Sequence, residues 1–321
     1  MFNKILREDN FLFFGYGRTA LEFGYYYLGL EKGDEILYPD YICDVTVLPA
    51  NKLGINIKYY KVTDNLEPDF EDVTRLLTPD TKAFLAVNYF GFPQPFKEIK
   101  AFCKQHGLFF IEDNAHSFLS QKNDNYLGTF GDIGILSFRK LVPLVNGAAL
   151  MINMDKNERF NLIEDKAKSL LYERVSYKRL KTSVQRFCEK RGIDLGTIIK
   201  RKQNIPEAGS TENEDLPYKI DRSSLKILSK YNLKLEKKRR KENYHKIVEL
   251  ANEELIPVFN ELPKGIIPQA CPFYSNNRNK WLEKFLSRGM NVYTWPTLPA
   301  AVSKHLSNAN GKWSRMIVIN I

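Results

Sequence analysis

Cysteine is scarce in this sequence of 321 residues, and long apolar runs are absent. The four cysteines, Cys43, Cys103, Cys188 and Cys271, show no C-x-x-C spacing, which argues against a disulfide scaffold or a zinc cluster. No stretch approaches the roughly 20 apolar residues that cross a bilayer, so we expect a soluble chain without membrane insertion. Residues 1–10 lack the apolar segment of a secretory signal. We therefore expect a cytoplasmic protein without a metal site.

The charge balance is basic, with 48 lysines and arginines against 38 acids and a net charge of +10. A hydrophobic content of 43% excludes disorder as the main state. The positive excess suggests an anionic ligand such as nucleic acid, a membrane surface or a phosphorylated metabolite. The densest basic run, Lys234 to Lys246, contains interleaved glutamates. We interpret it as the solvated face of one long helix within residues 223–255 rather than as a nucleic-acid site.

Apolar runs and helical spacings alternate regularly in the first half of the chain. This order of strand, helix and strand predicts a parallel sheet that is buried on both faces. Gly54 and Gly107 are placed to end two of the helices. The strands expected are residues 35–38, 55–60, 81–87 and 108–111, and the helices are residues 44–52, 68–77 and a segment with Phe96, Ile99, Phe102 and Cys103 on one face.

The second half has a different pattern. Residues 155–202 are charged and mostly helical in spacing, and residues 204–217 are polar, acidic and rich in turn-forming residues. We place the domain linker there, which gives a large domain at residues 1–215 and a smaller α+β domain at residues 216–321. In the smaller domain we expect the long helix, then short strands, the last of them within residues 316–321.

The first candidate site is Gly15-Tyr-Gly17-Arg-Thr-Ala20, a G-x-G-x-x-A pattern that follows an apolar run and opens a helix-like stretch. Glycines permit close approach of the backbone, and a helix N-terminus offers free N–H groups to a phosphate. The pattern is typical of a dinucleotide fold, with Asp40 available for a ribose. A plain structural turn explains it equally well.

The second candidate is Glu112-Asp113-Asn114-Ala115-His116, at the end of a predicted buried strand. Open α/β sheets place ligand-contacting residues at the carboxyl ends of their strands. A buried carboxylate there needs a cation, which at about 4 Å and an effective dielectric near 20 is worth roughly 4 kcal/mol. Capping of the next helix, or an arginine partner, is the alternative role for Asp113.

The third candidate runs from Gly128 to Lys140, with a short strand that ends in Ser137-Phe138 and a lysine on the loop just beyond. A lysine at the carboxyl edge of the sheet, within reach of Asp113, suits Schiff-base chemistry with an aldehyde cofactor. A pyridine nitrogen facing Asp113 would supply the missing cation. The alternative is that Arg139 and Lys140 are solvated loop charges.

Taken together, the order of these motifs resembles the DegT/DnrJ/StrS family of sugar aminotransferases over about residues 10–153. The shared patterns are G-R-T-A-L, P-x-Y, I-E-D-x-A-H and G-x-x-G-D-I-x-x-x-S-F-x-K. The resemblance implies an α/β protein of the pyridoxal-phosphate transferase fold type I. Such a protein has a mostly parallel central sheet flanked by helices and a smaller α+β C-terminal domain.

The resemblance also implies a role for each matching residue. Lys140 forms the internal aldimine and then acts as acid and base, while Asp113 keeps the pyridine nitrogen protonated. His116 lies against the ring near its hydroxyl. The residues implied to bind the phosphate are Arg18, Thr19 and Ser137.

At the position of Cys43, many members of the family carry an aromatic residue that stacks on the cofactor, and Tyr41 is the aromatic that can replace it here. The implied reaction moves an amino group, from glutamate, onto a nucleotide-linked keto-sugar for cell-envelope polysaccharide synthesis. A homodimer with active sites at its interface is also implied. The alternatives are a non-catalytic homologue that acts as a sugar-nucleotide sensor or partner subunit, and a nicotinamide-dependent Rossmann enzyme.

Overall fold

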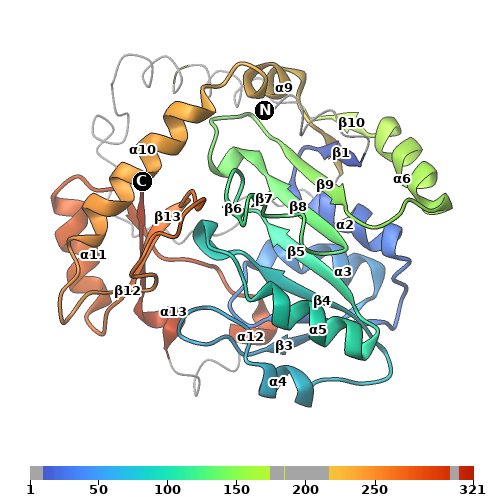
Figure 1. The fold of residues 1–321 in the computed structure, drawn as a ribbon, viewed down its shortest axis with the longest axis horizontal. Coiled ribbons are helices and arrows are strands. Elements are labelled where there is room, and N and C mark those ends of the chain that lie inside the picture. Colours follow the sequence, from blue (N-terminus) through green and yellow to red (C-terminus); the bar gives the residue numbers. More distant parts are fainter. Residues whose placement is uncertain (1–9, 174–183, 185–216, 304–310) are drawn as a thin grey trace.

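A seven-stranded sheet forms the centre of the first half of the chain in the computed structural model, which describes residues 10–173, 184, 217–303 and 311–321 (Figure 1). β9 runs antiparallel to its two neighbours, and the other neighbouring pairs are parallel. In spatial order the strands are β1 (Phe11–Phe14), β9 (Ala148–Ile152), β8 (Ile133–Ser137), β5 (Phe109–Asn114), β4 (Thr81–Val87), β2 (Glu35–Pro39) and β3 (Asn56–Tyr60). The mostly parallel sheet predicted from the sequence is confirmed.

Burial explains why these segments form strands. Every residue of β2, β8 and β9 is buried, and in β4 the side chain of Lys82 alone is exposed. Apolar residues can occupy both sides of such strands only when helices cover both faces of the sheet. The helices of this half, which flank the sheet, are α2 (Gly17–Leu28), α3 (Leu48–Leu53), α4 (Phe70–Arg75), α5 (Phe96–His106) and α6 (Glu158–Ser169).

Local sequence signals set the ends of several helices. α5 ends at Gly107, whose φ of 65° is left-handed, as expected for a glycine that terminates a helix. The helix expected over residues 44–52 is instead divided into a short 3-10 turn, η1 (Asp44–Thr46), and α3. Pro49 lies in the first turn of α3, where its missing N–H costs no hydrogen bond, so the helix begins there rather than at Asp44.

The second half contains a four-stranded antiparallel sheet with helices around it. Its strands are β12 (Ile256–Pro257), β13 (Ala270–Tyr274), β15 (Met316–Asn320) and β14 (Val292–Tyr293). Its helices are α9 (Arg222–Leu228), α10 (Leu233–Val248), α11 (Arg278–Ser287), α12 (Ala300–Ser303) and α13 (Lys312–Arg315). Two small strand pairs are β6 (Gln121–Lys122) with β7 (Asn125–Tyr126), and β10 (Leu171–Tyr172) with β11 (Tyr218–Lys219). The expected boundary between residues 215 and 216, and the linker before it, lie outside the described residues.

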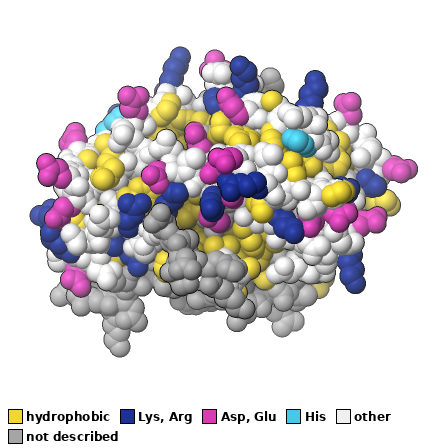
Figure 2. Space-filling view, turned by 90° about the horizontal axis from the view of Figure 1, so that it is seen from below, with side chains coloured by type: hydrophobic (Ala, Val, Ile, Leu, Met, Phe, Trp, Pro, Cys, Tyr) yellow, Lys and Arg dark blue, Asp and Glu magenta, His cyan; other side chains and the backbone are white. Residues whose placement is uncertain are grey.

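The basic run Lys234–Lys246 lies on one long helix, α10, as expected, but the stretch of residues 223–255 is divided between α9 and α10 rather than forming a single helix. The side chain of Asn232 accepts a hydrogen bond from Leu235 N at 3.1 Å and so starts a new helix. Lysine, arginine and acidic side chains are interspersed on the face shown in Figure 2. Within the described ranges, no helix has the length and apolar character needed to cross a membrane.

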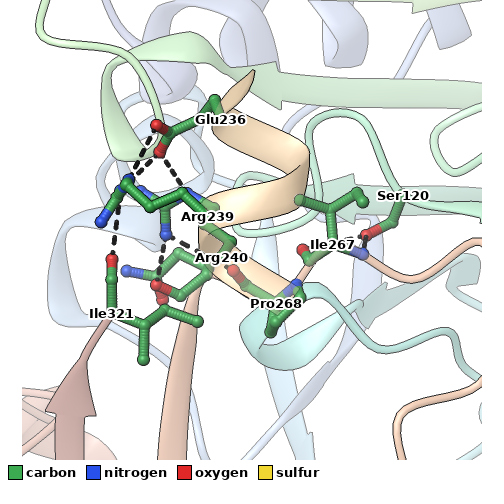
Figure 3. Close-up of polar contacts among 8 residues, drawn as sticks. Ser120, Glu236, Arg239, Arg240, Ile267, Pro268 and Ile321 are labelled. Carbon is green, nitrogen blue, oxygen red and sulfur yellow. Dashed lines mark hydrogen bonds and ion pairs between the residues drawn. The ribbon is translucent and has the colours of Figure 1, made fainter. Parts of the chain in front are cut away.

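Residues 265–269 join the two sheets. On one side, Ile267 N donates to Ser120 Oγ at 2.9 Å. On the other side, Arg240 of α10 donates to the backbone oxygen of Pro268 at 3.4 Å (Figure 3). It also donates to the backbone oxygen of Gln269 at 2.9 Å. Buried apolar residues from both sheets belong to one continuous cluster. The smaller sheet therefore packs close to the carboxyl ends of the strands of the larger sheet.

Candidate active site

Three parallel strands end side by side at the carboxyl edge of the large sheet. In register, Val87 of β4 faces Asp113 of β5, and Asp113 faces Ile135 of β8. This edge is where parallel α/β sheets bind ligands. Asp113 therefore occupies the middle of the edge, with the end of β8 and the loop that follows it on one side.

Asp113 is a buried carboxylate whose negative charge is only partly balanced by its neighbours. Its Oδ1 accepts a hydrogen bond from Ala115 N at 2.9 Å. Burial raises the pKa of Asp113 to about 6, although the Ala115 N–H and the charge of Lys140 both lower it. An additional cation at this carboxylate would remove the remaining penalty of burial.

Glu112, the preceding residue, has a different task. It is fully buried, and its two oxygens accept hydrogen bonds from Asn88 Nδ2, Gly128 N, Phe130 N and Gly131 N at 2.7, 2.6, 2.7 and 3.2 Å. Burial raises the pKa of Glu112, and these four donors oppose that shift. Glu112 thus fixes the loop that leads into β8, and it is a structural anchor rather than a ligand-contacting acid.

Lys140 ends the short turn η3 (Phe138–Lys140) that directly follows β8. Phe138 and Val142 are buried on either side of the lysine, while Lys140 itself is exposed. Its charge lowers the pKa values of Asp113, His116 and Cys43. The structure therefore brings together four residues from three separate segments of the sequence.

His116 presents an unsatisfied nitrogen at the site. Its ring stacks on Phe90 with centroids 5.6 Å apart and meets Trp295 edge-on at 4.9 Å. Nδ1 is buried and has no hydrogen-bond partner among the described residues. Burial, with a smaller effect of Lys140, holds the pKa of His116 well below its usual value, so the imidazole is neutral. A neutral ring with an unsatisfied nitrogen is suited to a polar group of a bound ligand.

Phe90 and Trp295 were not identified from the sequence as site residues. Phe90 has a φ of 53°, which is rare for a bulky residue. This feature is visible in the structure and not in the sequence. Trp295 belongs to the segment after α11 and reaches the site from the smaller sheet's side of the molecule. Contacts between segments this far apart leave no periodic pattern in a sequence.

Tyr41 and Cys43 follow β2. The Tyr41 hydroxyl donates to the backbone oxygen of Trp295, and its ring packs on Trp295 and Tyr89 at 5.4 and 5.9 Å. Tyr41 thus contacts the same indole that contacts His116. Burial raises the pKa of the Cys43 thiol to about 11, so the thiol stays protonated, and its Sγ lies 3.4 Å from Asp44 Oδ1.

Backbone hydrogen bonds connect the N-terminus of α2 to the same edge of the sheet. Gly147 N donates to Gly15 O at 2.7 Å, and Phe138 N donates to Gly147 O at 3.0 Å. Thr19 in the first turn of α2 and Ser137 at the end of β8 are both buried. The N-cap residue of α2 gives no side-chain hydrogen bond to the first turn, and such a terminus favours an anion.

Comparison with known proteins shows which family this sequence matches. The sequence profile of the DegT/DnrJ/EryC1/StrS aminotransferase family matches residues 1–180, more than half of the chain. The chain belongs to this family. GDP-perosamine synthase of Vibrio cholerae is 25% identical over 91% of this chain and 83% of its own length.

Solved structures of DegT/DnrJ/EryC1/StrS relatives share the fold. A Helicobacter pylori aminotransferase of pseudoaminic acid biosynthesis has a TM-score of 0.70 and 17% identity, with 99% of this chain and 84% of that chain covered. The Escherichia coli GDP-4-keto-6-deoxy-D-mannose-3-dehydratase, solved with hydrated pyridoxal phosphate, has a TM-score of 0.65 and 18% identity over 97% and 82%. These similarities confirm the expected fold.

The residues present fit the cofactor of this family. The carboxylate of Asp113 lacks a full countercharge, and Nδ1 of His116 lacks a partner within the described chain. The start of α2 lacks a side-chain cap. A pyridinium nitrogen, a ring hydroxyl and a phosphate match these three features in turn. In a Rossmann fold, by contrast, the glycine pattern follows a strand of a parallel βαβ unit, whereas β1 is an edge strand beside antiparallel β9.

Proposed function

We propose that this chain is a pyridoxal-phosphate-dependent aminotransferase that moves an amino group from glutamate onto a nucleotide-linked keto-sugar. The observation that carries the proposal is the convergence of Lys140, Asp113 and His116 at one sheet edge. Family membership and the names of the relatives support the substrate class. The basic net charge suits a diphosphate-bearing substrate.

Each site residue has a distinct task in this proposal. When bound, the cofactor supplies an electron sink for the carbon that loses its proton. Asp113 holds a proton on the ring nitrogen, and the neutral His116 hydrogen-bonds the ring hydroxyl through Nδ1. Lys140 Nζ provides the amine for attachment and afterwards takes and returns the proton that moves during amino transfer.

The remaining site residues position the phosphate and the ring. Arg18, Thr19 and Ser137 bind the phosphate at the start of α2. Tyr41 and Cys43 line the ring side of the site, with Tyr41 acting through the indole that it packs against. No step of the transfer needs a metal ion, and no group of histidine, cysteine and acidic residues in the described chain could hold one.

The biological setting proposed is cytoplasmic synthesis of an amino sugar for a polysaccharide. The free thiols of Cys43, Cys103 and Cys271 agree with a reducing compartment. We also propose a homodimer with active sites at its interface, and the division into domains at residues 1–215 and 216–321. Analytical ultracentrifugation tests the homodimer.

Transfer of isotopic label tests the proposed reaction. The purified protein, supplied with pyridoxal phosphate, is incubated with ¹⁵N-glutamate and GDP-4-keto-6-deoxy-D-mannose, with Lys140→Ala as control. The expected result is a ¹⁵N-labelled amino sugar and 2-oxoglutarate from the wild type alone. Loss of water from the sugar without label, or no reaction with a panel of keto-sugar nucleotides, would contradict the proposal.

A further inference from the structure

Trp295 lies at the centre of an aromatic cluster beside the candidate active site. Its indole is buried and meets four rings edge-on, with centroid distances of 4.9 Å to His116, 5.4 Å to Phe90, 5.4 Å to Tyr41 and 6.1 Å to Tyr89. Edge-to-face contacts at these distances are favourable and depend on the angle between the rings. The indole therefore limits how the rings around it can turn.

The backbone that carries the indole is held from two directions. The carbonyl oxygens of residues 295–297 each accept one hydrogen bond, and the donors are the Tyr41 hydroxyl, Trp313 Nε1 and Asp44 N. Tyr41 and Asp44 follow β2 of the large sheet, whereas Trp313 belongs to α13, which contacts β13 of the smaller sheet. Three successive carbonyl groups held in this way leave the segment little freedom to shift.

The imidazole of His116 depends on its packing because no hydrogen bond orients it. Neither ring nitrogen has a hydrogen-bond partner among the described residues, and Nδ1 is buried. In many functional sites a hydrogen bond at one ring nitrogen sets the orientation and the tautomer of a histidine. Here the ring stacks on Phe90 and meets Trp295 edge-on. Ring packing, rather than hydrogen bonding within the described chain, therefore sets the direction of Nδ1.

We propose that Trp295 is a positioning residue, which holds the His116 imidazole so that Nδ1 points at the ring hydroxyl of the cofactor. The inference rests on the proposed function and extends it to a residue that lies between β14 and α12, in the half of the chain that forms the smaller sheet. In this role Trp295 acts through His116 rather than on the cofactor itself. The second half of the chain thereby completes a site built on the edge of the large sheet.

A double-mutant cycle tests whether Trp295 acts through His116. Dissociation constants for pyridoxal phosphate are measured by absorbance titration for the wild type, Trp295→Leu, His116→Phe and the double variant. Replacement of Trp295 can then cost no more affinity than loss of Nδ1 does, which is about tenfold. Trp295→Leu should weaken binding about three- to tenfold in the wild type and less than about twofold in His116→Phe. Trp295→Phe keeps an aromatic edge and should bind within about twofold of the wild type.

Two further variants separate positioning from loss of folding. Tyr41→Phe keeps its ring but removes the hydroxyl that holds the Trp295 carbonyl, so it should weaken binding about two- to threefold, again only when His116 is present. Trp281→Leu is the matched control, because Trp281 is also buried and packs on Phe285 with ring centroids 5.5 Å apart. It should lose stability and bind pyridoxal phosphate as the wild type does. Thermal unfolding of the cofactor-free proteins checks that each variant folds.

Each contrary outcome has a distinct meaning. Equal weakening by Trp295→Leu in the two backgrounds would show that Trp295 acts independently of His116 and would overturn the inference. Unchanged affinity in Trp295→Leu, or in Tyr41→Phe if Trp295→Leu does not fold, would overturn it as well, while the proposed function would stand. Binding by Trp295→Phe as weak as that of Trp295→Leu would exclude ring packing as the cause. If the wild type binds no pyridoxal phosphate, both the proposed function and the inference fail.

Discussion

Replacement of Asp113 by asparagine should stabilise the cofactor-free protein and weaken its cofactor binding. Asparagine keeps the shape of the side chain and keeps Oδ1 as the acceptor for Ala115 N. It removes the charge whose burial raises the pKa of Asp113 to about 6. A residue retained for function at a cost in stability should show these two opposite effects.

The magnitude follows from the pKa shift. The ordinary value is 3.8 and the folded value is about 6, so the unfolded chain loses this proton at lower pH than the folded chain does. The ionised carboxylate destabilises the folded state, and this penalty is absent below about pH 3.8, grows between pH 3.8 and 6 and is complete above pH 6. At 1.36 kcal/mol per pKa unit it reaches about 3 kcal/mol. Asp113→Asn should therefore exceed the wild type by up to about 3 kcal/mol at pH 8 and by about 1 kcal/mol at pH 4.5.

Urea unfolding of the cofactor-free proteins at the two pH values measures the difference, and absorbance titration measures cofactor affinity. Asp40→Asn is the matched control, because burial also raises the pKa of Asp40 to about 6, with Lys312 opposing the shift. Asp40→Asn should gain stability at pH 8 and bind the cofactor as the wild type does. The reasoning is refuted if Asp113→Asn is less stable than the wild type at pH 8, or if its advantage does not shrink as the pH falls.

Three further predictions concern neighbouring groups. Glu112→Gln turns an amide N–H₂ toward backbone N–H donors and should lower the free energy of unfolding by about 2–4 kcal/mol in urea; a loss below 1 kcal/mol would contradict the anchoring role. Arg240→Ala should lower the free energy of unfolding by about 3–5 kcal/mol, because Arg240 is buried and bonded to Glu236 and Gln269. Arg239 is half-exposed and is paired with the same Glu236 (Figure 3). Arg239→Ala should therefore lower the free energy of unfolding by less than about 1 kcal/mol. Equal losses would argue against this packing. His116→Phe keeps the ring contacts but removes Nδ1, so cofactor affinity should fall by about tenfold with no loss of thermal stability; unchanged affinity would exclude the proposed hydrogen bond.

β2 and β4 could be predicted well because each is a short apolar run that is almost entirely buried. Residues 81–87 were expected as a strand and form β4 with the same bounds. The break between α9 and α10 could not be foreseen, because no glycine or proline marks it. It depends on the side chain of Asn232, which either caps a helix or lies within one according to its surroundings.

The site was predicted in part. Asp113, Ser137 and Lys140 could be located because carboxyl ends of parallel strands share one edge. The sequence assigned a task to Asp113 and none to Glu112, whose anchoring of the loop before β8 is seen only in its hydrogen bonds to Gly128, Phe130 and Gly131. Phe90 and Trp295 depend on tertiary contacts between distant segments, so neither local spacing nor composition could reveal them.

Identification of the lysine that holds the cofactor tests the proposed chemistry most directly. The protein is loaded with pyridoxal phosphate, its visible spectrum is recorded beside that of Lys140→Ala, and borohydride is added before peptide mapping by mass. The proposed function predicts a visible band in the wild type and a pyridoxyl group fixed on Lys140. A fixed group on another lysine would contradict the role of Lys140, and no fixed group after saturation with the cofactor would contradict the aminotransferase itself.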